Sequence, residues 1–294
     1  MSIILVVILL LFVGIAFYNH TDNTTNDNNT ISTIVAVNQD TTSALSTNDT
    51  LKITYDTLSS TTNHFIKIDL LELPSLTNEE VIIEHTGFRL AYSEKHEQAK
   101  WVAYEFTKAE TIKKVDRTDD FRPDPKVLTG SATSTDYKGS GFDRGHLAPA
   151  GDLSWSAEAM SCSFFYSNMS PQTPSFNRGI WKKLEEQVRD WSKTYDTIYV
   201  VTGPVLEDSL PTIGENMVSI PKYYYKVILE YKSNSTKAIG FILPNEKSPF
   251  PLNNFIVSID SVEQMTGIDF FHQLPDSIEN KIEKSVCNAC WGIN

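Results

Sequence analysis

The chain of 294 residues carries 25 basic and 37 acidic side chains, which gives a formal net charge of −12, and 40% of its residues are hydrophobic. This apolar content can build one sizeable core, so we expect one folded domain of about 200 to 250 residues and no second full domain. The negative charge excludes a protein that attracts nucleic acid through an overall positive field, so any polyanion site must be a local patch.

The chain begins with an apolar segment. Residues 3–18 are apolar apart from Gly14, and no Lys or Arg precedes Lys52. This run is short for a membrane span of about 20 residues and long for the apolar centre of a signal peptide, about 7 to 15 residues. The charge asymmetry favours export of the remainder. We therefore predict that residues 1–18 are a signal peptide or an N-terminal membrane anchor, with cleavage left open, and that the protein is periplasmic or extracellular.

The composition then changes to Asn, Thr, Ser and Asp over residues 19–63. Such a stretch buries too little apolar surface to offset the entropy lost on ordering, which predicts a flexible linker. The folded domain is expected over residues 64–294.

The domain combines segments typical of strands with fewer helical patterns. β-Branched and aromatic residues predict strands. Three-to-four spacing of apolar residues predicts helices, and Gly267 is a plausible stop for the last one. In chain order the expected elements are strands at 81–85, 88–93 and 101–107, helices at 156–166 and 177–194, strands at 197–203, 223–231 and 238–244, and a helix from Asp260 to Gly267. This pattern predicts an α+β fold with a largely antiparallel central sheet flanked by helices.

The motif DRGHLAPAGD, residues 143–152, places Arg144 two residues before His146. An imidazole is mostly neutral at pH 7 and can accept a proton from water, whereas a guanidinium binds a phosphate through a planar fork of donors. Hydrolysis of a phosphodiester needs both a better nucleophile and neutralisation of charge. Asp143 is expected to anchor the loop through hydrogen bonds, and Gly145 to permit a strained turn.

Asn177 stands near the start of the helix expected at 177–194. Its amide oxygen is a hard, neutral ligand of the kind that Mg²⁺ accepts, although an asparagine at this place is more often a helix N-cap. Glu185 follows eight positions later, and in a continuous α-helix it would face the same site about 12 Å further along the axis. Contact with a bound ion through water is therefore more plausible for Glu185 than direct ligation.

These residues carry a family resemblance. The motif DRGHLAPAGD is followed by SNMSPQTPSFNRGIWKKLEE at 167–186, and the segments WVAYEFT, FRPDP, VVTGPV and IDSVEQMTGIDFF stand in the same order along the chain. From Thr86 to Phe271 the chain resembles the sugar-non-specific DNA/RNA endonucleases of the ββα-metal group. The combination of DRGH with the downstream NRGIWKKLE makes the resemblance specific.

The resemblance implies a ββα-metal active-site motif and a role for each matching residue. His146 matches the general base, and Asn177 matches the direct ligand of Mg²⁺, which Mn²⁺ can replace. Glu185 matches a glutamate that holds water on the metal, and Asn168 matches a position that supports the site by hydrogen bonding. A second phosphate-binding arginine is expected upstream.

Two arginines compete for that second place, Arg117 and Arg122, and we favour Arg117. Further basic residues on the polar side of the predicted helix are either a solvated face or a local nucleic-acid patch: Arg178, Lys182, Lys183, Arg189 and Lys193. The other five histidines have no comparable neighbours in the sequence.

The pair Cys287 and Cys290 in CNAC supplies only two of the four ligands that a structural zinc site needs, so we expect no zinc there. In an exported chain we expect a disulfide, either between Cys287 and Cys290 or from one of them to Cys162.

The sequence thus predicts a secreted or membrane-anchored, Mg²⁺-dependent endonuclease that cuts DNA and RNA with little sequence preference. One alternative is a catalytically silent nucleic-acid-binding module at the cell surface. Another is a surface protein whose sheet displays a site for a protein partner. The oligomeric state stays open.

Overall fold

The computed structural model describes residues 68–77, 80–232 and 235–293. All of them belong to the second of the two units into which the chain divides, residues 60–294. The predicted leader at 1–18 and linker at 19–63 lie outside the described residues. None of the helices in the described ranges is long and apolar enough to cross a membrane.

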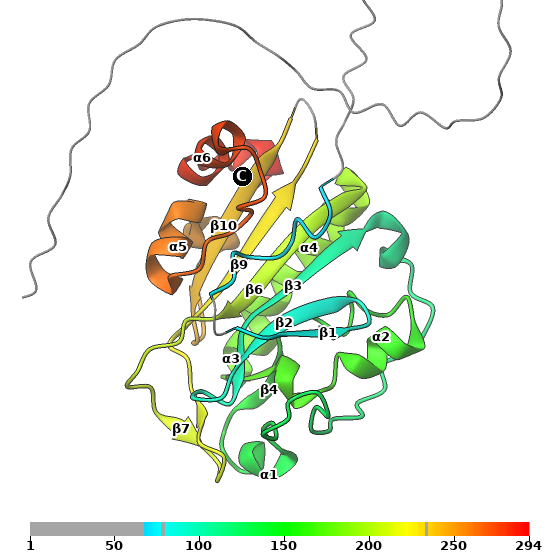
Figure 1. Cartoon of the computed structure of the whole chain (residues 1–294), viewed down its shortest axis with the longest axis vertical. Coiled ribbons are helices and arrows are strands. Elements are labelled where there is room, and N and C mark those ends of the chain that lie inside the picture. Colours follow the sequence, from blue (N-terminus) through cyan, green and yellow to red (C-terminus); the bar gives the residue numbers. More distant parts are fainter. Residues whose placement is uncertain (1–67, 78–79, 233–234, 294) are drawn as a thin grey trace, which may run out of the picture. The chain divides into compact units, whose positions relative to one another are not determined.

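A seven-stranded sheet forms the centre of the domain, and every neighbouring pair of strands is antiparallel (Figure 1). All of the predicted strands are present in it. The spatial order is β1 (Ile82–His85), β2 (Phe88–Ser93), β3 (Gln98–Thr107), β6 (Thr197–Pro204), β9 (Tyr223–Glu230), β10 (Lys237–Pro244) and β11 (Ile256–Val257).

Both faces of this sheet are buried, which explains why its central strands are apolar almost throughout. In β6, Ile198 and Val200 belong to the hydrophobic cluster on one face, whereas Tyr199 and Val201 belong to the cluster on the other. Successive side chains of a strand point to opposite faces, so a sheet covered on both sides needs apolar residues at every position.

Helices cover the two faces of the sheet. Leu184, Val188 and Trp191 of α4 (Lys182–Tyr195) enter the first cluster. On the other face, α5 (Ile259–Thr266) and α6 (Asp276–Lys284) contribute to the second cluster. The resulting layered α+β architecture, with a largely antiparallel sheet, is the predicted fold class.

Shorter elements connect these layers. They are η1 (Lys108–Thr111), α1 (Ser134–Tyr137), α2 (Ala157–Cys162), η2 (Tyr166–Asn168), the pair β7 (Thr212–Ile213) and β8 (Val218–Ser219), η4 (Leu252–Phe255) and η5 (Ala289–Trp291).

The helix predicted at 156–166 is wrong in its length, because α2 ends at Cys162. The backbone beyond it bonds to Arg122 instead of continuing the helix: the Arg122 N–H donates to the Phe164 carbonyl at 3.3 Å, and the Tyr166 N–H donates to the Arg122 carbonyl at 3.0 Å. This long-range pairing is invisible to a local pattern. The prediction for α5 holds, and Gly267 ends that helix with φ at 70°.

The C-terminal segment is fixed against α4. Cys287 and Cys290 form the disulfide, which is one of the two alternatives considered, and Cys162 is free. Just beyond the disulfide, the Trp291 side chain is buried, and its ring centroid lies 4.7 Å from that of Trp191. The Trp191 indole N–H donates to the Trp291 carbonyl at 2.8 Å. The end of the described chain is therefore part of the core.

We predict that Trp291→Ala lowers the free energy of unfolding by about 3–5 kcal/mol, since it removes a large buried side chain and leaves a cavity. Urea denaturation measures this cost. The matched control is Val286→Ala, because Val286 is 50% exposed. Equal midpoints for both variants would contradict the assignment of the C-terminal segment to the core.

Candidate active site

The motif DRGH forms a short strand, β4 (Asp143–His146), which pairs antiparallel with β5 (Met169–Gln172). Three helical pieces follow β5 directly: α3 (Pro174–Phe176), the π-helical turn η3 (Asn177–Trp181) and α4. Two antiparallel strands followed by a helix make a ββα unit, and this unit carries most of the predicted site residues.

Gly145 was predicted to permit a strained turn, but the structure gives it a different role. It lies inside β4 and is not among the glycines with positive φ, so no strained turn requires it. A Cβ at this position would lie 2.2 Å from Cδ of Gln172 on the paired strand. The glycine therefore permits the close approach of β4 to the Gln172 side chain.

Alternation along β4 places Arg144 and His146 on the same side of the strand. The Arg144 guanidinium lies 3.8 Å above the centre of the Phe121 ring. The His146 ring contacts Phe164 and Phe121 edge to face, with centroids 4.9 Å and 5.9 Å away. His146 is only 8% exposed, and its buried Nε2 has no hydrogen-bond partner within the described ranges.

This environment keeps the His146 imidazole neutral. Burial, together with the positive charges of Arg117 and Arg144, lowers its pKa to about 3. A neutral ring whose Nε2 has no protein partner in the described ranges keeps a lone pair that can accept a proton.

Asp143 joins β4 to the start of the helical segment. The Asn177 Nδ2 donates to Asp143 Oδ2 at 2.9 Å. Arg178 binds the same carboxylate through two donors, Nε at 2.8 Å and Nη2 at 2.6 Å. The structure thus brings Asp143, Arg144, Asn177 and Arg178 together at one place.

Asn177 is not a helix N-cap. Pro174 begins α3, and the Asn177 backbone N–H donates to the Thr173 carbonyl at 2.9 Å, so Asn177 already lies within the helical turn. Its Nδ2 is used by Asp143, and its amide oxygen accepts no hydrogen bond from any described residue. That oxygen remains available to a ligand.

The predicted continuous helix from 177 to 194 is wrong. Gly179, with φ −106° and ψ −110°, interrupts the helical backbone between Asn177 and α4. The rotation calculated for an unbroken helix therefore does not relate Asn177 to Glu185. Glu185 is half-buried in the first turn of α4, and burial raises its pKa, which the positive charge of Lys226 opposes.

Asn168 is fully buried, and its side chain bonds to the backbone near His146. Its Nδ2 donates to the carbonyls of Ala148 and Ser163 at 2.9 Å each, and its Oδ1 accepts from the Ala148 N–H at 2.9 Å. All of its side-chain groups are occupied by backbone. Asn168 therefore holds the chain that follows His146 and does not reach toward a ligand.

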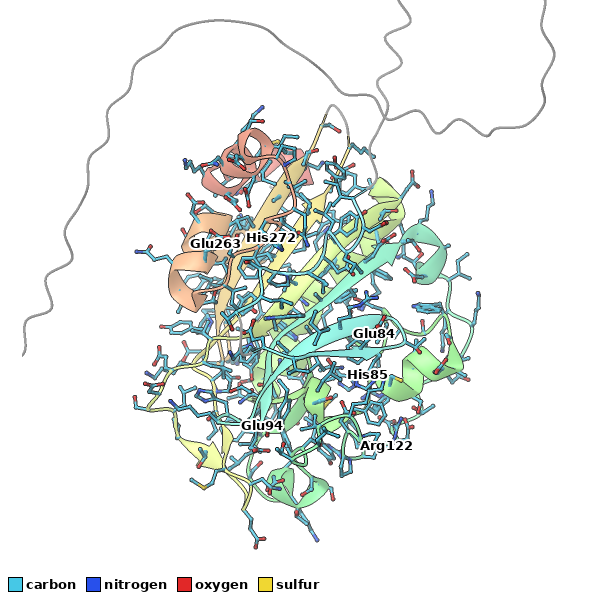
Figure 2. The ribbon with its side chains drawn as sticks, viewed as in Figure 1. Glu84, His85, Glu94, Arg122, Glu263 and His272 are labelled. Atoms are coloured by element: carbon cyan, nitrogen blue, oxygen red, sulfur yellow. A yellow bond between two sulfur atoms is a disulfide. The ribbon has the colours of Figure 1, made fainter. Side chains whose placement is uncertain are left out.

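The structure separates the two candidate arginines. The Arg122 guanidinium bonds to Asp120 and Ser161, at 2.7 Å and 2.8 Å, and lies 4.0 Å above the Phe165 ring. His85 packs against the same ring, and Figure 2 shows Arg122 close to His85. Arg117 instead lies 4.7 Å above Phe164, the ring that also contacts His146.

His85 has a buried partner that its neighbours in the sequence do not reveal. Its Nε2 lies 2.7 Å from Oδ2 of Asp124, and both side chains are buried. Burial lowers the pKa of His85, but its interactions with Asp124 and Cys162 together outweigh burial, and the net shift is upward. Asp124 also accepts from Ser167 and the Lys126 N–H, so the His85–Asp124 pair anchors the loop around it.

A cavity of about 550 Å³ opens beside β4. Its basic lining residues are Arg117, Lys138, Arg144 and Arg178, and its acidic ones are Asp119 and Asp143. Neither Arg144 nor Lys138 forms an ion pair with a carboxylate of the described chain. The cavity is therefore locally positive in an acidic protein. His146 and Glu185 do not line it, but the His146 ring contacts Phe121, which does.

Three of the basic residues on α4 that were considered for a local patch lie beside acidic side chains. Lys182 lies 3.8 Å from Glu186, Lys193 lies 3.0 Å from Asp190, and Arg189 lies 2.7 Å from Asp152. These ion pairs offset the positive charge of most basic side chains on α4. Of the five basic residues, only Arg178 lines the cavity.

Comparison with known proteins agrees with this geometry. The sequence profile of the DNA/RNA non-specific endonucleases matches residues 69–277, more than half of the chain. The chain belongs to this family.

Relatives within the endonuclease family are similar over most of the domain. Mitochondrial nuclease EXOG of Xenopus laevis is 37% identical over 211 residues, which are 65% of this chain and 58% of the relative. Nuclease C1 of Cunninghamella echinulata var. echinulata is 38% identical over 213 residues, 65% of this chain and 83% of the relative. The chain thus spans about three fifths of the length of the EXOG protein.

A solved structure supports the same fold. A chain in the crystal structure of the EndoG/EndoGI complex superposes with a TM-score of 0.64 and 32% sequence identity. The superposition covers 70% of this chain and 90% of that chain.

Beside the cavity residues, the endonuclease domain has a buried group of charges that sequence reasoning missed. Asp152 accepts from Arg189 at 2.7 Å and from the Tyr104 hydroxyl at 2.9 Å. Lys226 is fully buried, its Nζ has no hydrogen-bond partner in the described ranges, and it lies 4.8 Å above the Trp181 ring. Burial lowers the pKa of Lys226, whereas the nearby charges of Glu185 and Asp152 oppose that shift.

One signal for this group was available in the sequence. Lys226 interrupts an otherwise apolar strand, YYYKVILEY, at a position that a sheet buried on both faces must enclose. A lysine at such a position needs a compensating carboxylate. Its acidic neighbours, Glu185 on α4 and Asp152 in a loop, could not be identified from their spacing in the sequence.

The depressed pKa of His146 predicts a dependence of stability on pH. An unfolded chain takes up a proton on this imidazole below pH 6.5, whereas the folded chain does so only near pH 3. Stability from this group is therefore complete above pH 6.5 and is lost as the pH falls toward 3, by about 1.4 kcal/mol per pH unit.

His146→Gln is expected to flatten this part of the stability curve, because glutamine does not titrate. Urea denaturation of both proteins between pH 7 and pH 4.5 gives the free energy of unfolding at each pH. The comparison uses the slope of this free energy with pH, because the substitution can also change the absolute stability. Parallel curves would show that the folded-state pKa of His146 is near normal.

Proposed function

We propose that this family member is a divalent-metal-dependent endonuclease that hydrolyses phosphodiester bonds of DNA and RNA with little sequence preference. One observation carries the proposal: His146 is a buried, neutral imidazole with a free Nε2, placed beside a cavity that three arginines line.

His146 is the proposed general base. Water that attacks phosphorus must lose a proton, and a neutral imidazole accepts it at Nε2. The Phe121 and Phe164 rings, which also contact each other, pack edge to face against the His146 ring and restrict its movement. Binding of an anionic phosphate beside Arg117 and Arg144 would offset their positive charges, which raises the basicity of His146 when substrate is present.

Arg144 is the proposed phosphate clamp. It lies in the cavity without a carboxylate partner in the described chain, so binding a phosphate breaks no ion pair. Arg117 shares the cavity but is paired with Asp119 at 2.6 Å, both side chains being largely exposed. An exposed pair of this kind is weak and can exchange for a phosphate contact at little cost.

The residues present fit a hard divalent cation such as Mg²⁺ or Mn²⁺. The free amide oxygen of Asn177 and the carboxylate of Asp143 lie side by side at the cavity, and both are oxygen donors. Asn177 would hold the ion, with Asp143 fixing its side chain. When bound, the ion would neutralise negative charge on the phosphate. Glu185 is proposed to order water near this site.

Recognition of the backbone explains the proposed lack of sequence preference. The basic cavity residues suit phosphate oxygens, which are common to every nucleotide and carry no sequence information. The proposed export or membrane anchorage rests only on the composition of residues 1–18 and of the linker at 19–63.

We predict that His146→Ala lowers the rate of plasmid cleavage at least 100-fold, which is the scale of loss of a general base. The assay is run with Mg²⁺ and with EDTA, and circular dichroism checks the fold. The control is His272→Ala, an exposed histidine on the loop before α6. Cleavage by His146→Ala at the wild-type rate would remove the mechanism. Tight DNA binding by a wild type that cleaves in neither condition would favour the silent binding module.

Asn177→Ala is expected to raise the Mg²⁺ concentration needed for half-maximal activity, because it removes the proposed ligand oxygen. The comparison is a Mg²⁺ titration of the cleavage rate, with Asn280→Ala, an exposed asparagine of α6, as control. An unchanged Mg²⁺ requirement would mean that Asn177 serves only to position Asp143.

A further inference from the structure

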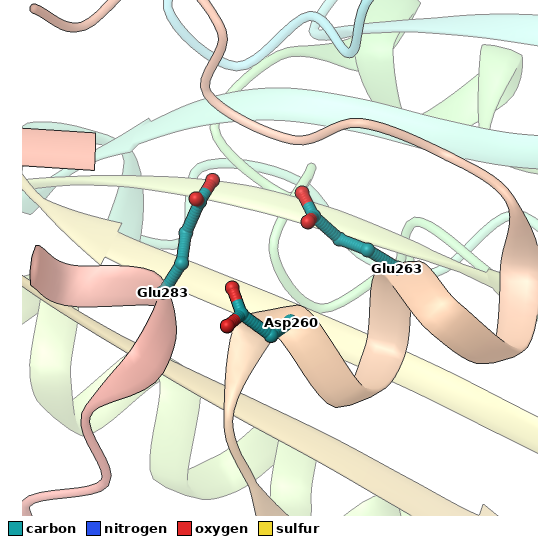
Figure 3. A group of neighbouring side chains, drawn as sticks. All are labelled: Asp260, Glu263 and Glu283. Carbon is teal, nitrogen blue, oxygen red and sulfur yellow. The ribbon is translucent and has the colours of Figure 1, made fainter. Parts of the chain in front are cut away.

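Five carboxylates gather where α5 and α6 meet, on the sheet face opposite α4. Oxygens of Asp260, Glu263 and Glu283 lie within 4.8 Å of one another, and so do oxygens of Asp269, Glu279 and Glu283. Figure 3 shows the side chains of Asp260 and Glu263 from α5 and of Glu283 from α6 turned toward one another. Glu283 is common to both groups.

One oxygen of the Glu283 carboxylate, Oε1, is buried without a partner in the described chain. The residue is 8% exposed, and its Oε1 accepts no hydrogen bond within the described chain. An unpaired buried carboxylate oxygen is costly, and such groups in folded proteins are usually paired or bound to a metal. Its position between the other carboxylates points to a ligand that is itself positively charged.

Within the described residues, no lysine or arginine forms an ion pair with this group. None of the ion pairs among the described residues involves Asp260, Glu263, Asp269, Glu279 or Glu283. His272 favours the charged form of Glu279 only weakly, since burial and acidic neighbours outweigh it. Burial, together with the negative charges of Glu263 and the other acids, raises the pKa of Glu283 to about 8. A bound cation would offset the cost of burying the Glu283 carboxylate and would reduce the repulsion among the acids.

The chemistry of the donors selects the class of cation. Every donor is a carboxylate oxygen, which suits a hard ion and excludes a preference for soft metals. Ca²⁺ binds six to eight oxygens at about 2.3–2.6 Å, so opposite ligands lie about 5 Å apart. The separations up to 4.8 Å between these oxygens fit that sphere, whereas Mg²⁺ demands shorter distances and stricter geometry.

We propose that Asp260, Glu263 and Glu283, supported by Asp269 and Glu279, form a Ca²⁺ site that joins α5 to α6. Neither group of carboxylates shares a residue with the cavity beside β4. One oxygen of Glu263 accepts from the Phe270 N–H at 2.9 Å, so the site also fixes the turn after α5.

Such a site would stabilise the C-terminal helices. Ile259 and Val262 of α5 and Ile282 of α6 pack in the same hydrophobic cluster under the carboxylates. Without a cation, repulsion between the acids opposes this packing. With Ca²⁺ bound, the same acids hold the two helices together.

The test uses the full chain, freed of metal with EDTA and then titrated with CaCl₂, with thermal unfolding and calorimetric binding as readouts. We expect Ca²⁺ to raise the Tm of the wild type by roughly 5 °C or more at 100 times its Kd. Glu283→Gln should weaken Ca²⁺ binding at least tenfold. Above about pH 8, glutamine also removes one repelling charge, so in EDTA at about pH 9 the variant should melt at or above the wild-type temperature, and this order should reverse in Ca²⁺.

Matched variants separate this site from the cavity and from non-specific screening. Glu215→Gln, an exposed acid in the turn between β7 and β8, should keep the full Ca²⁺ shift, and so should Asn177→Ala. Nuclease activity of Glu283→Gln with Mg²⁺, below its Tm, should stay within twofold of wild type. A full Ca²⁺ shift in Glu283→Gln, no shift in the wild type, a shift abolished by Asn177→Ala, or a larger shift with Mg²⁺ would each overturn the proposal.

Discussion

The contact between Asp143 and the pair Asn177–Arg178 holds the candidate active site together. Asp143 opens the strand that carries Arg144 and His146, whereas Asn177 and Arg178 begin the helical segment after β5. One carboxylate therefore fixes the distance between two parts of the chain that are more than thirty positions apart. The orientation of the Asn177 amide, with its nitrogen on Asp143 and its oxygen free, follows from this bond. Without it, the proposed base, clamp and ligand would share no common geometry.

Burial and local charge then adapt the site to a polyanion. The protein is acidic overall, yet the cavity beside β4 gathers four basic side chains and only two acidic ones. The same arginines that attract phosphate also disfavour protonation of His146, so the imidazole stays neutral until substrate arrives. At the other end of the domain the relation is inverted, because five carboxylates crowd together where α5 meets α6 and attract a cation instead. Each of the two places thus carries a local excess of one sign of charge.

Local sequence patterns predicted the strands of the sheet well, since a strand buried on both faces is apolar at nearly every position. They failed where a distant residue or a backbone irregularity decides the structure. Arg122 stops α2, and Gly179 breaks the helix that carries Asn177, which changes its relation to Glu185. The helix α6 was missed because its sequence, DSIENKIEK, has only two apolar residues. In the site, the DRGH motif identified Arg144 and His146, but the partners of Lys226 depend on tertiary packing and could not be found from spacing.

The account depends on a cation and His146 acting on the same phosphate. Anomalous diffraction from crystals of the His146→Ala protein, grown with Mn²⁺ and a short DNA duplex, locates both the ion and the phosphate directly. We predict a manganese peak within about 2.5 Å of the Asn177 amide oxygen, with a phosphate between that ion and the vacated imidazole position. A cavity that binds DNA but shows no manganese at Asn177, or a phosphate out of reach of residue 146, would contradict the account.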